Sequence, residues 1–167
     1  HQDLRQRQHC LVPLQVAQAL AESGLSPGRL DLELTESIVL QDIDAVATDL
    51  RSLLDLGVHV SIDDFGTGYS SLNYIKKLPV DRIKIDMSFV RNICTEPSDA
   101  AIVRAIITLG HSLDMKVVAE GVETPEQLAR MQAEGCDEVQ GYYFGKPMPA
   151  DDFIALVARQ SREALSA

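Results

Sequence analysis

The sequence predicts an α/β domain built on a parallel sheet, and three observations carry this prediction. Five segments of strand-like composition alternate with segments of helical periodicity. The connections between them are short, which favours right-handed strand–helix–strand crossovers. Apolar and polar residues alternate within the strand segments. With 167 residues, of which 46% are hydrophobic and 24% charged, the chain is the size of one soluble domain with a sizeable core.

The expected elements follow one another in a regular order. A helical pattern at residues 11–22 ends in the Ser, Gly and Pro residues of 23–28. Thr124 is the expected N-cap of a later helix, with Pro125 at its first position. The expected strands are 30–35, 58–63, 82–86, 115–119 and 138–142, and the helical patterns that follow them are 42–56, 70–77, 98–113, 125–134 and 150–164.

Two sheet architectures fit this order of elements. On length alone an open, doubly wound sheet is favoured, because an eight-stranded barrel takes about 250 residues. The strand pattern favours a barrel: Leu32 and Leu34 alternate with Asp31, Glu33 and Thr35, whereas a parallel sheet covered on both faces reads as continuous apolar runs. Polar groups near the carboxyl ends of several strands are typical of a barrel mouth. We therefore predict part of a (βα)8 TIM-type barrel that lacks its first strands.

Charge and composition exclude several classes of partner. A net charge of −10, from 25 acidic and 15 basic residues, argues against binding a DNA or RNA duplex or an anionic membrane surface. No apolar run is long enough to span a bilayer. The 3 cysteines are far apart and the 4 histidines have no ligand spacing, so neither a disulfide framework nor a zinc site is predicted. A reducing cytoplasm is the expected location.

Adjacent carboxylates at the end of one strand are the most informative feature. Asp63 and Asp64 close the strand at 58–63 and are followed by Gly66 and Gly68. Two neighbouring acids repel each other unless a cation lies between them, and a divalent ion with oxygen ligands is a common solution. The alternative is a solvated turn in which Asp64 caps the next helix.

Five further polar residues lie near the ends of the other expected strands, and each has a structural alternative. Taken singly, Glu33 could be a structural acid paired with a base, and Lys84 could be a surface lysine whose aliphatic stem is buried. Glu120 and Glu123 precede a helix, whose N-terminus favours acids, and Gln140 would satisfy backbone groups. Because all five fall in register with the acidic pair, they indicate a single site.

These residues lie in motifs that resemble the EAL family of bacterial cyclic diguanylate phosphodiesterases. The resemblance spans nearly the whole chain, with the motifs in the family's order and spacing. They are ELTES at 33–37, DDFGTGYSS at 63–71, KID at 84–86, AEGVE at 119–123 and QGYYFGKP at 140–147.

The resemblance implies metal-dependent hydrolysis of cyclic di-GMP to linear pGpG in bacterial second-messenger signalling, with two Mg²⁺ or Mn²⁺ ions as cofactors. It implies that Glu33, Asp63 and Asp64 bind metal directly and that Glu120 completes the second ion's surroundings. Lys84 would orient or deprotonate the attacking water, or offset phosphate charge. Gln140 would bind water or substrate near the metals.

The resemblance also assigns roles around the loop after Asp64. Glu123, with Thr35 nearby, would anchor this loop, and Gly66 and Gly68 would allow its backbone angles. The family uses the loop for dimer contacts, so a homodimer is expected.

The chain departs from the family at its start. The Glu-Ala-Leu segment that names the family lies upstream, and a second ligand, an Asn, falls where His1 stands. Residues 1–167 are therefore expected to be a single, N-terminally incomplete EAL domain, with any membrane anchor in other domains of a parent protein.

Two alternatives to a hydrolase stay open. One is a catalytically inactive receptor that binds cyclic di-GMP; the other is a dimerisation or scaffold module. Tyr142, Tyr143 and Phe144 are candidates for stacking on guanine, with core packing as the alternative.

Overall fold

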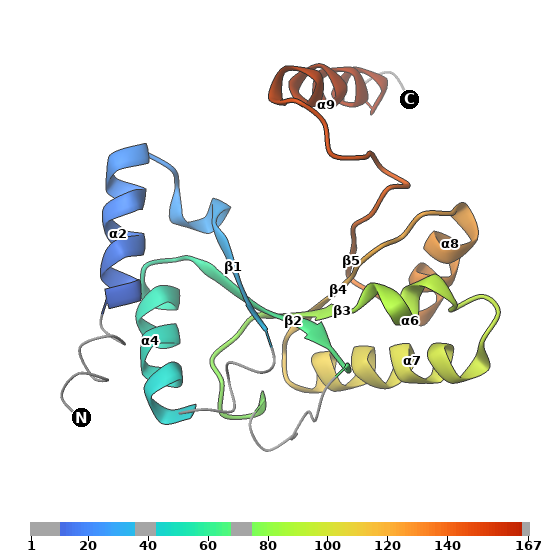
Figure 1. Cartoon of the computed structure of the whole chain (residues 1–167), viewed down its shortest axis with the longest axis horizontal. Coiled ribbons are helices and arrows are strands. Elements are labelled where there is room, and N and C mark those ends of the chain that lie inside the picture. Colours follow the sequence, from blue (N-terminus) through green and yellow to red (C-terminus); the bar gives the residue numbers. More distant parts are fainter. Residues whose placement is uncertain (1–10, 36–42, 68–74, 165–167) are drawn as a thin grey trace.

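A computed structural model describes residues 11–35, 43–67 and 75–164. Helices are interspersed with five strands along the described chain (Figure 1). In order they are α2 (Leu11–Ser23), the 3₁₀ helix η1 (Pro27–Arg29), β1 (Asp31–Thr35), α4 (Ile43–Asp55), β2 (His59–Phe65), β3 (Arg82–Ile85), α6 (Met87–Arg91), α7 (Pro97–Ser112), β4 (Lys116–Ala119), α8 (Pro125–Glu134), β5 (Glu138–Val139) and α9 (Ala150–Ala164).

The five strands form one parallel sheet in the order β1-β2-β3-β4-β5. Each new strand is added on the same side as the one before. Right-handed crossovers that always advance in one direction place their helices on one face of the sheet, whereas a doubly wound sheet reverses direction and covers both faces. Figure 1 shows α4 and α7 on the same side of the sheet. The architecture is therefore a segment of a barrel, and the doubly wound alternative favoured by length is wrong.

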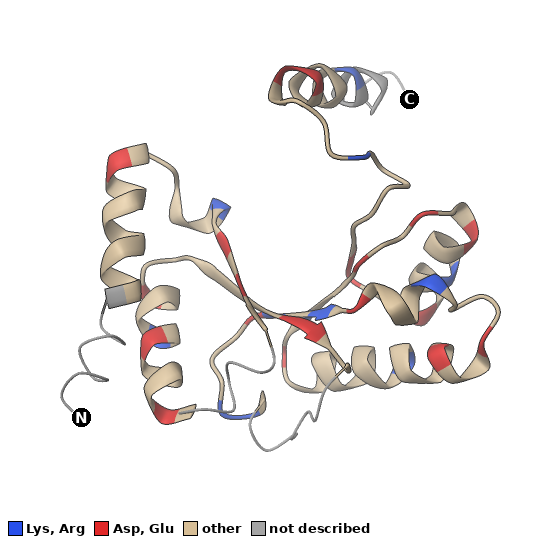
Figure 2. Cartoon of the chain, in the orientation of Figure 1, with Lys and Arg blue, Asp and Glu red and all other residues tan. Residues whose placement is uncertain are grey.

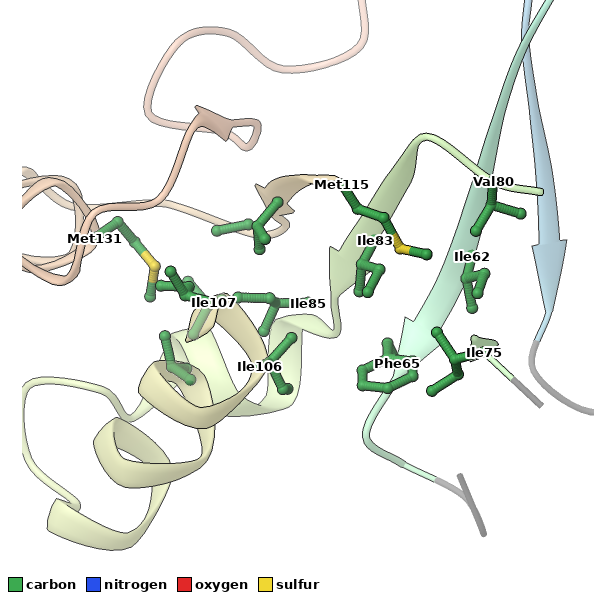
Figure 3. Packing of buried hydrophobic residues seen from close by; sticks show 14 of the residues in the cluster. Ile62, Phe65, Ile75, Val80, Ile83, Ile85, Ile106, Ile107, Met115 and Met131 are labelled. Carbon is green, nitrogen blue, oxygen red and sulfur yellow. The ribbon is translucent and has the colours of Figure 1, made fainter. Parts of the chain in front are cut away.

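The apolar residues of the strands face these helices and form the core. Leu34, Ile62, Ile83 and Val117 align across four neighbouring strands. Figure 3 shows Ile85 of β3 near Ile106 and Ile107 of α7, and the cluster of buried residues also includes Ile83. Ile83 and Ile85 are completely buried, and full burial of such a side chain contributes about 1.5–3 kcal/mol. The alternation predicted from the sequence thus places one face of the sheet in the core.

The opposite face of the sheet is polar. Arg82 Nη1 lies 3.1 Å from Glu138 Oε2 and 3.5 Å from Asp31 Oδ2, and the Ser61 hydroxyl donates to Asp31 Oδ1 at 3.0 Å. Figure 2 shows charged residues of both signs on the strands at the centre of the sheet. These ion pairs link first residues of strands that are far apart in the sequence, as expected for the inner face of a barrel wall.

Most boundaries agree with the sequence-based expectation to within two residues, but two features differ and one expected helix is largely untested. The short helices η1 and α6 were not expected. The last strand was expected at 138–142 and ends at Val139, because Gly141 turns the chain against Val122, whose N–H donates to Gln140 O at 3.0 Å. The helix expected at 70–77 lies mainly outside the described residues.

The predicted start of α8 agrees with the structure, and two histidines pair with acids. Thr124 caps α8 in a complete capping box with Pro125 at the first turn. His59 pairs with Asp81 at 2.5 Å and His111 with Asp137 at 2.8 Å, so both histidines have carboxylate partners away from the predicted site. No helix within the described ranges is both long enough and apolar enough to cross a membrane.

Candidate metal centre

A bulge at the end of β2 creates the acidic pair. Ile62 pairs with Ile83 and Phe65 with Ile85, so three steps along β2 match two along β3. In a regular strand, adjacent residues point to opposite faces, but the extra residue re-aims the chain here. Asp64 takes up the distortion with φ 53°, in the left-handed region that Asp enters more readily than most residues. Phe65 then returns to the core, with 4% of its surface exposed.

Three carboxylates gather at this edge of the sheet. Asp63, Asp64 and Glu120 each offer one oxygen, and these atoms all lie within 4.8 Å of one another. Among the described residues, Asp63 Oδ1 is buried and accepts no hydrogen bond of good geometry, although it lies 3.2 Å from Lys84 Nζ. A buried carboxylate oxygen with a free lone pair suits a hard divalent cation, which takes oxygen ligands. The donor set fits Mg²⁺ or Mn²⁺.

Lys84 lies in the middle of the acidic residues. Its ammonium is 2.7 Å from Glu33 Oε1 and 2.5 Å from Glu120 Oε1, besides its contact with Asp63. The side chain is only 7% exposed, whereas Glu33 is 51% exposed. Lys84 therefore joins carboxylates from β1, β2 and the end of β4, and it balances part of their charge.

The charges in this cluster shift one another's pKa values. Burial acts to lower the pKa of Lys84, but its close contacts with the carboxylates of Glu120, Glu33 and Asp63 outweigh burial and raise that pKa above 10.5. Burial raises the pKa of Glu120, with Asp63 and Glu33 adding to the rise and Lys84 opposing it. Burial and the charge of Asp63 also raise the pKa of Asp64. Lys84 is consequently a fixed cation at neutral pH, while the acids crowd one another and would gain from a second cation.

Glu120 is held from several sides. Its N–H donates to Ile85 O at 3.2 Å at the end of β3. Its carboxylate accepts from Gln140 Nε2 at 2.5 Å as well as from Lys84. Gln140 therefore orients Glu120 through a side-chain amide.

The chain after Glu120 depends on Gly121. This residue has φ 71°, and a Cβ there would lie 2.7 Å from Met87 Cβ. Gly121→Ala should destabilise the protein by about 1–3 kcal/mol through this overlap, in addition to its backbone strain. Gly135→Ala is the matched control, since Gly135 has φ 83° and open space around it. Urea unfolding of both variants measures the difference, and equal losses would contradict the predicted role of the Met87 contact.

A pocket of about 730 Å³ opens beside Glu120 and Gln140. Tyr142, Phe144 and Lys146 line it, and Lys146 Nζ lies 5.6 Å above the Tyr142 ring. Tyr142, Tyr143 and Phe144 are between 43% and 54% exposed, so the core-packing alternative for these aromatic residues is wrong. Their open faces can stack on a planar base.

The remaining predicted residues lie around the cluster. Thr35 pairs in register with Asp63, and Glu123 lines the pocket. Gly66 has φ 98°, and a Cβ there would lie 3.1 Å from the Phe89 ring. Gly68 is outside the described residues, as is the rest of the loop through residue 74. The anchoring of this loop by Thr35 and Glu123 therefore stays a prediction.

Asp86 is a site residue that reasoning about the strands did not single out. Its carboxylate interacts with Asp64 and accepts hydrogen bonds from the Ser88 N–H, at 2.9 Å, and from the Ser88 hydroxyl. Burial acts to raise the pKa of Asp86, but the Ser88 bonds outweigh it and lower that pKa. The signal available in the sequence was the Asp-x-Ser spacing of an N-cap.

The sequence profile of the EAL domain matches residues 2–147. The chain belongs to the EAL domain family. MucR of Pseudomonas aeruginosa, described as a bifunctional diguanylate cyclase/cyclic di-GMP phosphodiesterase, is 48% identical over 143 residues, which cover 86% of this chain and 21% of MucR. This EAL chain thus spans about a fifth of the length of that relative.

Solved EAL structures share the fold. The MucR phosphodiesterase in complex with c-di-GMP superposes with a TM-score of 0.78 at 48% identity, covering 83% of this chain and 56% of that one. The EAL domain of Mycobacterium smegmatis DcpA superposes with a TM-score of 0.82 at 44% identity, covering 88% of this chain and 66% of that one. BlrP1 of Klebsiella pneumoniae, in a manganese and cyclic di-GMP complex, superposes with a TM-score of 0.73 at 35% identity, covering 80% of this chain and 34% of that one. The TIM-barrel fold class and EAL membership predicted from the sequence are confirmed.

Proposed function

We propose that this EAL domain is a cyclic di-GMP phosphodiesterase that produces linear pGpG with the aid of two divalent cations, Mg²⁺ or Mn²⁺. The observation that carries the proposal is the convergence of oxygens from Asp63, Asp64 and Glu120 within 4.8 Å of one another. Glu120 also lines an open pocket. Relatives solved with manganese and cyclic di-GMP support the same metal and ligand classes.

The metal-binding residues follow from this geometry and from the family resemblance. Asp63, Asp64 and Glu120 would hold divalent ions, with Glu33, which contacts Lys84, as a further ligand. Bound ions of this kind activate water and stabilise the attacking and leaving oxygens of a phosphoryl group. A strongly acidic chain also needs cations to accept an anionic nucleotide.

The chain's own residues supply orientation and charge. Lys84 is protonated at neutral pH because its carboxylate partners raise its pKa, so of the roles considered for it we propose orientation of water and offset of phosphate charge rather than proton removal. Gln140 orients Glu120. Tyr142 and Phe144 present aromatic faces to the pocket for a guanine base, and stacking of this type contributes about 1–3 kcal/mol per base.

Hydrolysis to pGpG has a simple bond balance. Water forms a new bond to one phosphorus, and the bond from that phosphorus to the ribose 3′ oxygen breaks. The released 3′ oxygen takes up a proton, and the phosphate stays on the 5′ carbon of its own ribose. In this proposal, Lys84 would offset the charge that develops on the phosphate oxygens.

The deciding experiment is incubation of this chain with cyclic di-GMP and Mn²⁺ or Mg²⁺, followed by chromatographic separation of the products. We expect pGpG only when metal is present, and none after chelation with EDTA. Binding of cyclic di-GMP without product would instead support the inactive receptor. If cyclic di-GMP is neither bound nor hydrolysed, both the hydrolase and the receptor are contradicted, and a dimerisation or scaffold role is left.

The homodimer contact after Asp64 and the cytoplasmic location remain part of the proposal. Analytical ultracentrifugation tests the homodimer.

A further inference from the structure

We propose that Gln127 is a positioning residue that connects helix α6 to the loop carrying Glu120 and Glu123. This inference rests on the proposed function, because it assigns Glu120 to the metal centre. The connected segment, residues 120–124, is called the Glu120 loop below. Gln127 lies in the first turn of α8, outside the metal cluster, and only 7% of it is exposed.

The side-chain amide of Gln127 makes three hydrogen bonds. Its Oε1 accepts from Glu123 N at 2.7 Å and from Thr124 N at 3.0 Å. Its Nε2 donates to the carbonyl of Arg91 at 3.2 Å, in the last turn of α6. Both ends of the amide are therefore used, and one side chain joins two segments that are 36 positions apart in the sequence.

A capping role alone does not account for this arrangement. A capping box needs one acceptor at this position, and Glu serves as well as Gln. A carboxylate, however, has no hydrogen to donate to the Arg91 carbonyl and would repel it. The bond to Arg91 and the second bond, to Glu123, go beyond the cap and tie the Glu120 loop to α6.

Helix α6 in turn is fixed at the metal centre. Asp86, its N-cap, interacts with Asp64, and Met87 packs against Gly121. The Glu120 loop is also held at Val122, whose N–H donates to Gln140 O at 3.0 Å and whose side chain is completely buried. Gln127 closes this ring of contacts at the far end of the loop, so its loss frees the Glu123 and Thr124 amides and loosens the Glu120 loop.

Three variants separate positioning from capping. Gln127→Met removes every side-chain hydrogen bond at similar length, and Gln127→Glu keeps the acceptor and loses the donor to Arg91. Gln132→Met is the matched control, because Gln132 is an exposed residue of the same helix. Thermal unfolding of each variant identifies the temperature range in which all four proteins are folded.

Two measurements are then made in that range. Amide hydrogen exchange without metal should be about tenfold faster at Glu123 and Thr124 in Gln127→Met, because their acceptor is gone. Calorimetric titration with Mn²⁺ should give about tenfold weaker binding for Gln127→Met, as for other residues that orient ligands indirectly. Gln127→Glu should fall between Gln127→Met and the unsubstituted chain, and Gln132→Met should match the unsubstituted chain.

The outcomes distinguish this inference from the proposed function. A lower melting temperature with unchanged exchange and unchanged Mn²⁺ affinity would mean that Gln127 is only a cap, and the inference would be overturned. Faster exchange in the loop, together with weakened Mn²⁺ binding, supports it. If the unsubstituted chain binds no Mn²⁺, both the metal-dependent function and the positioning role are overturned.

Discussion

Asp63→Asn should abolish metal-dependent hydrolysis of cyclic di-GMP, with a loss of roughly a thousandfold or more. Asparagine keeps the size of the side chain and removes the charge. Loss of a carboxylate ligand removes several kcal/mol of charge stabilisation, and about 1.4 kcal/mol corresponds to a factor of ten in rate. Asp63 is one of the three clustered carboxylates. Among the described residues, its Oδ1 is buried and accepts no hydrogen bond of good geometry.

The measurement is steady-state hydrolysis with Mn²⁺, beside calorimetric Mn²⁺ binding. Asp55→Asn is a suitable control, because Asp55 is exposed at the end of α4 and away from the site. Circular dichroism verifies that both variants fold. Full activity of Asp63→Asn would refute the assignment of this residue as a metal ligand.

Lys84→Met should cause two losses that respond differently to metal: a loss of stability that metal offsets and a large loss of activity that metal does not restore. The substitution leaves Glu33, Asp63 and Glu120 without their shared cation. Removing one partner of a buried ion pair costs about 3–5 kcal/mol. Because Glu33 is half exposed and its charge is screened by water, we expect a smaller loss, about 2–3 kcal/mol of unfolding free energy.

For a domain of this size, such a loss lowers the melting temperature by roughly 4–12 °C. A divalent cation bound to the same carboxylates replaces the missing positive charge, so Mn²⁺ should raise the melting temperature of Lys84→Met more than that of the unsubstituted chain. Hydrolysis should stay about 10²–10³-fold lower even with saturating metal, because a charge aimed at the phosphate is gone.

The contribution of Lys84 to folding stability depends on pH with a defined sign. The partners of Lys84 raise its pKa above 10.5 in the folded state despite the opposing effect of burial. Its contribution to stability is therefore fully present at neutral pH and is lost only as the pH rises through that elevated pKa. The difference in melting temperature between Lys84→Met and the unsubstituted chain should be constant through the neutral pH range and shrink in strong alkali.

Lys116→Met controls for removal of a lysine from a neighbouring strand. Lys116 is 61% exposed and lies 3.4 Å from Glu138, and exposed ion pairs contribute less than about 1 kcal/mol. Differential scanning calorimetry with and without Mn²⁺ compares the variants. An unchanged melting temperature for Lys84→Met would mean that its carboxylate partners do not depend on this charge.

Several parts of the fold follow from short stretches of sequence. The alternation of Leu32 and Leu34 with polar neighbours predicted which face of β1 is covered, and the pair Thr124-Pro125 predicted where α8 begins. These patterns are local: the period of two in a strand and the hydrogen bonds of a helix start involve residues within a few positions of each other. Site residues in register were also predictable, because parallel strands end at the same edge.

The bulge at Asp63 and Asp64 was not predictable in this way. The sequence predicts opposite directions for adjacent residues of a strand, and it is the pairing of β2 with β3 that inserts the extra residue. The short helix α6 was missed for a similar reason. Five residues carry too little periodicity, and contacts to Asp64 and Gln127 hold it in place.

The sequence by itself therefore determined the class of fold, the family and the set of candidate residues, since these are written in local patterns and in motifs read along the chain. Tertiary structure alone decided which charges meet. Lys84 and Glu33 are 51 positions apart and come within 2.7 Å, and Gln140 reaches Glu120 across 20 positions. Such contacts depend on strand order and on the curvature of the sheet, which no single segment encodes.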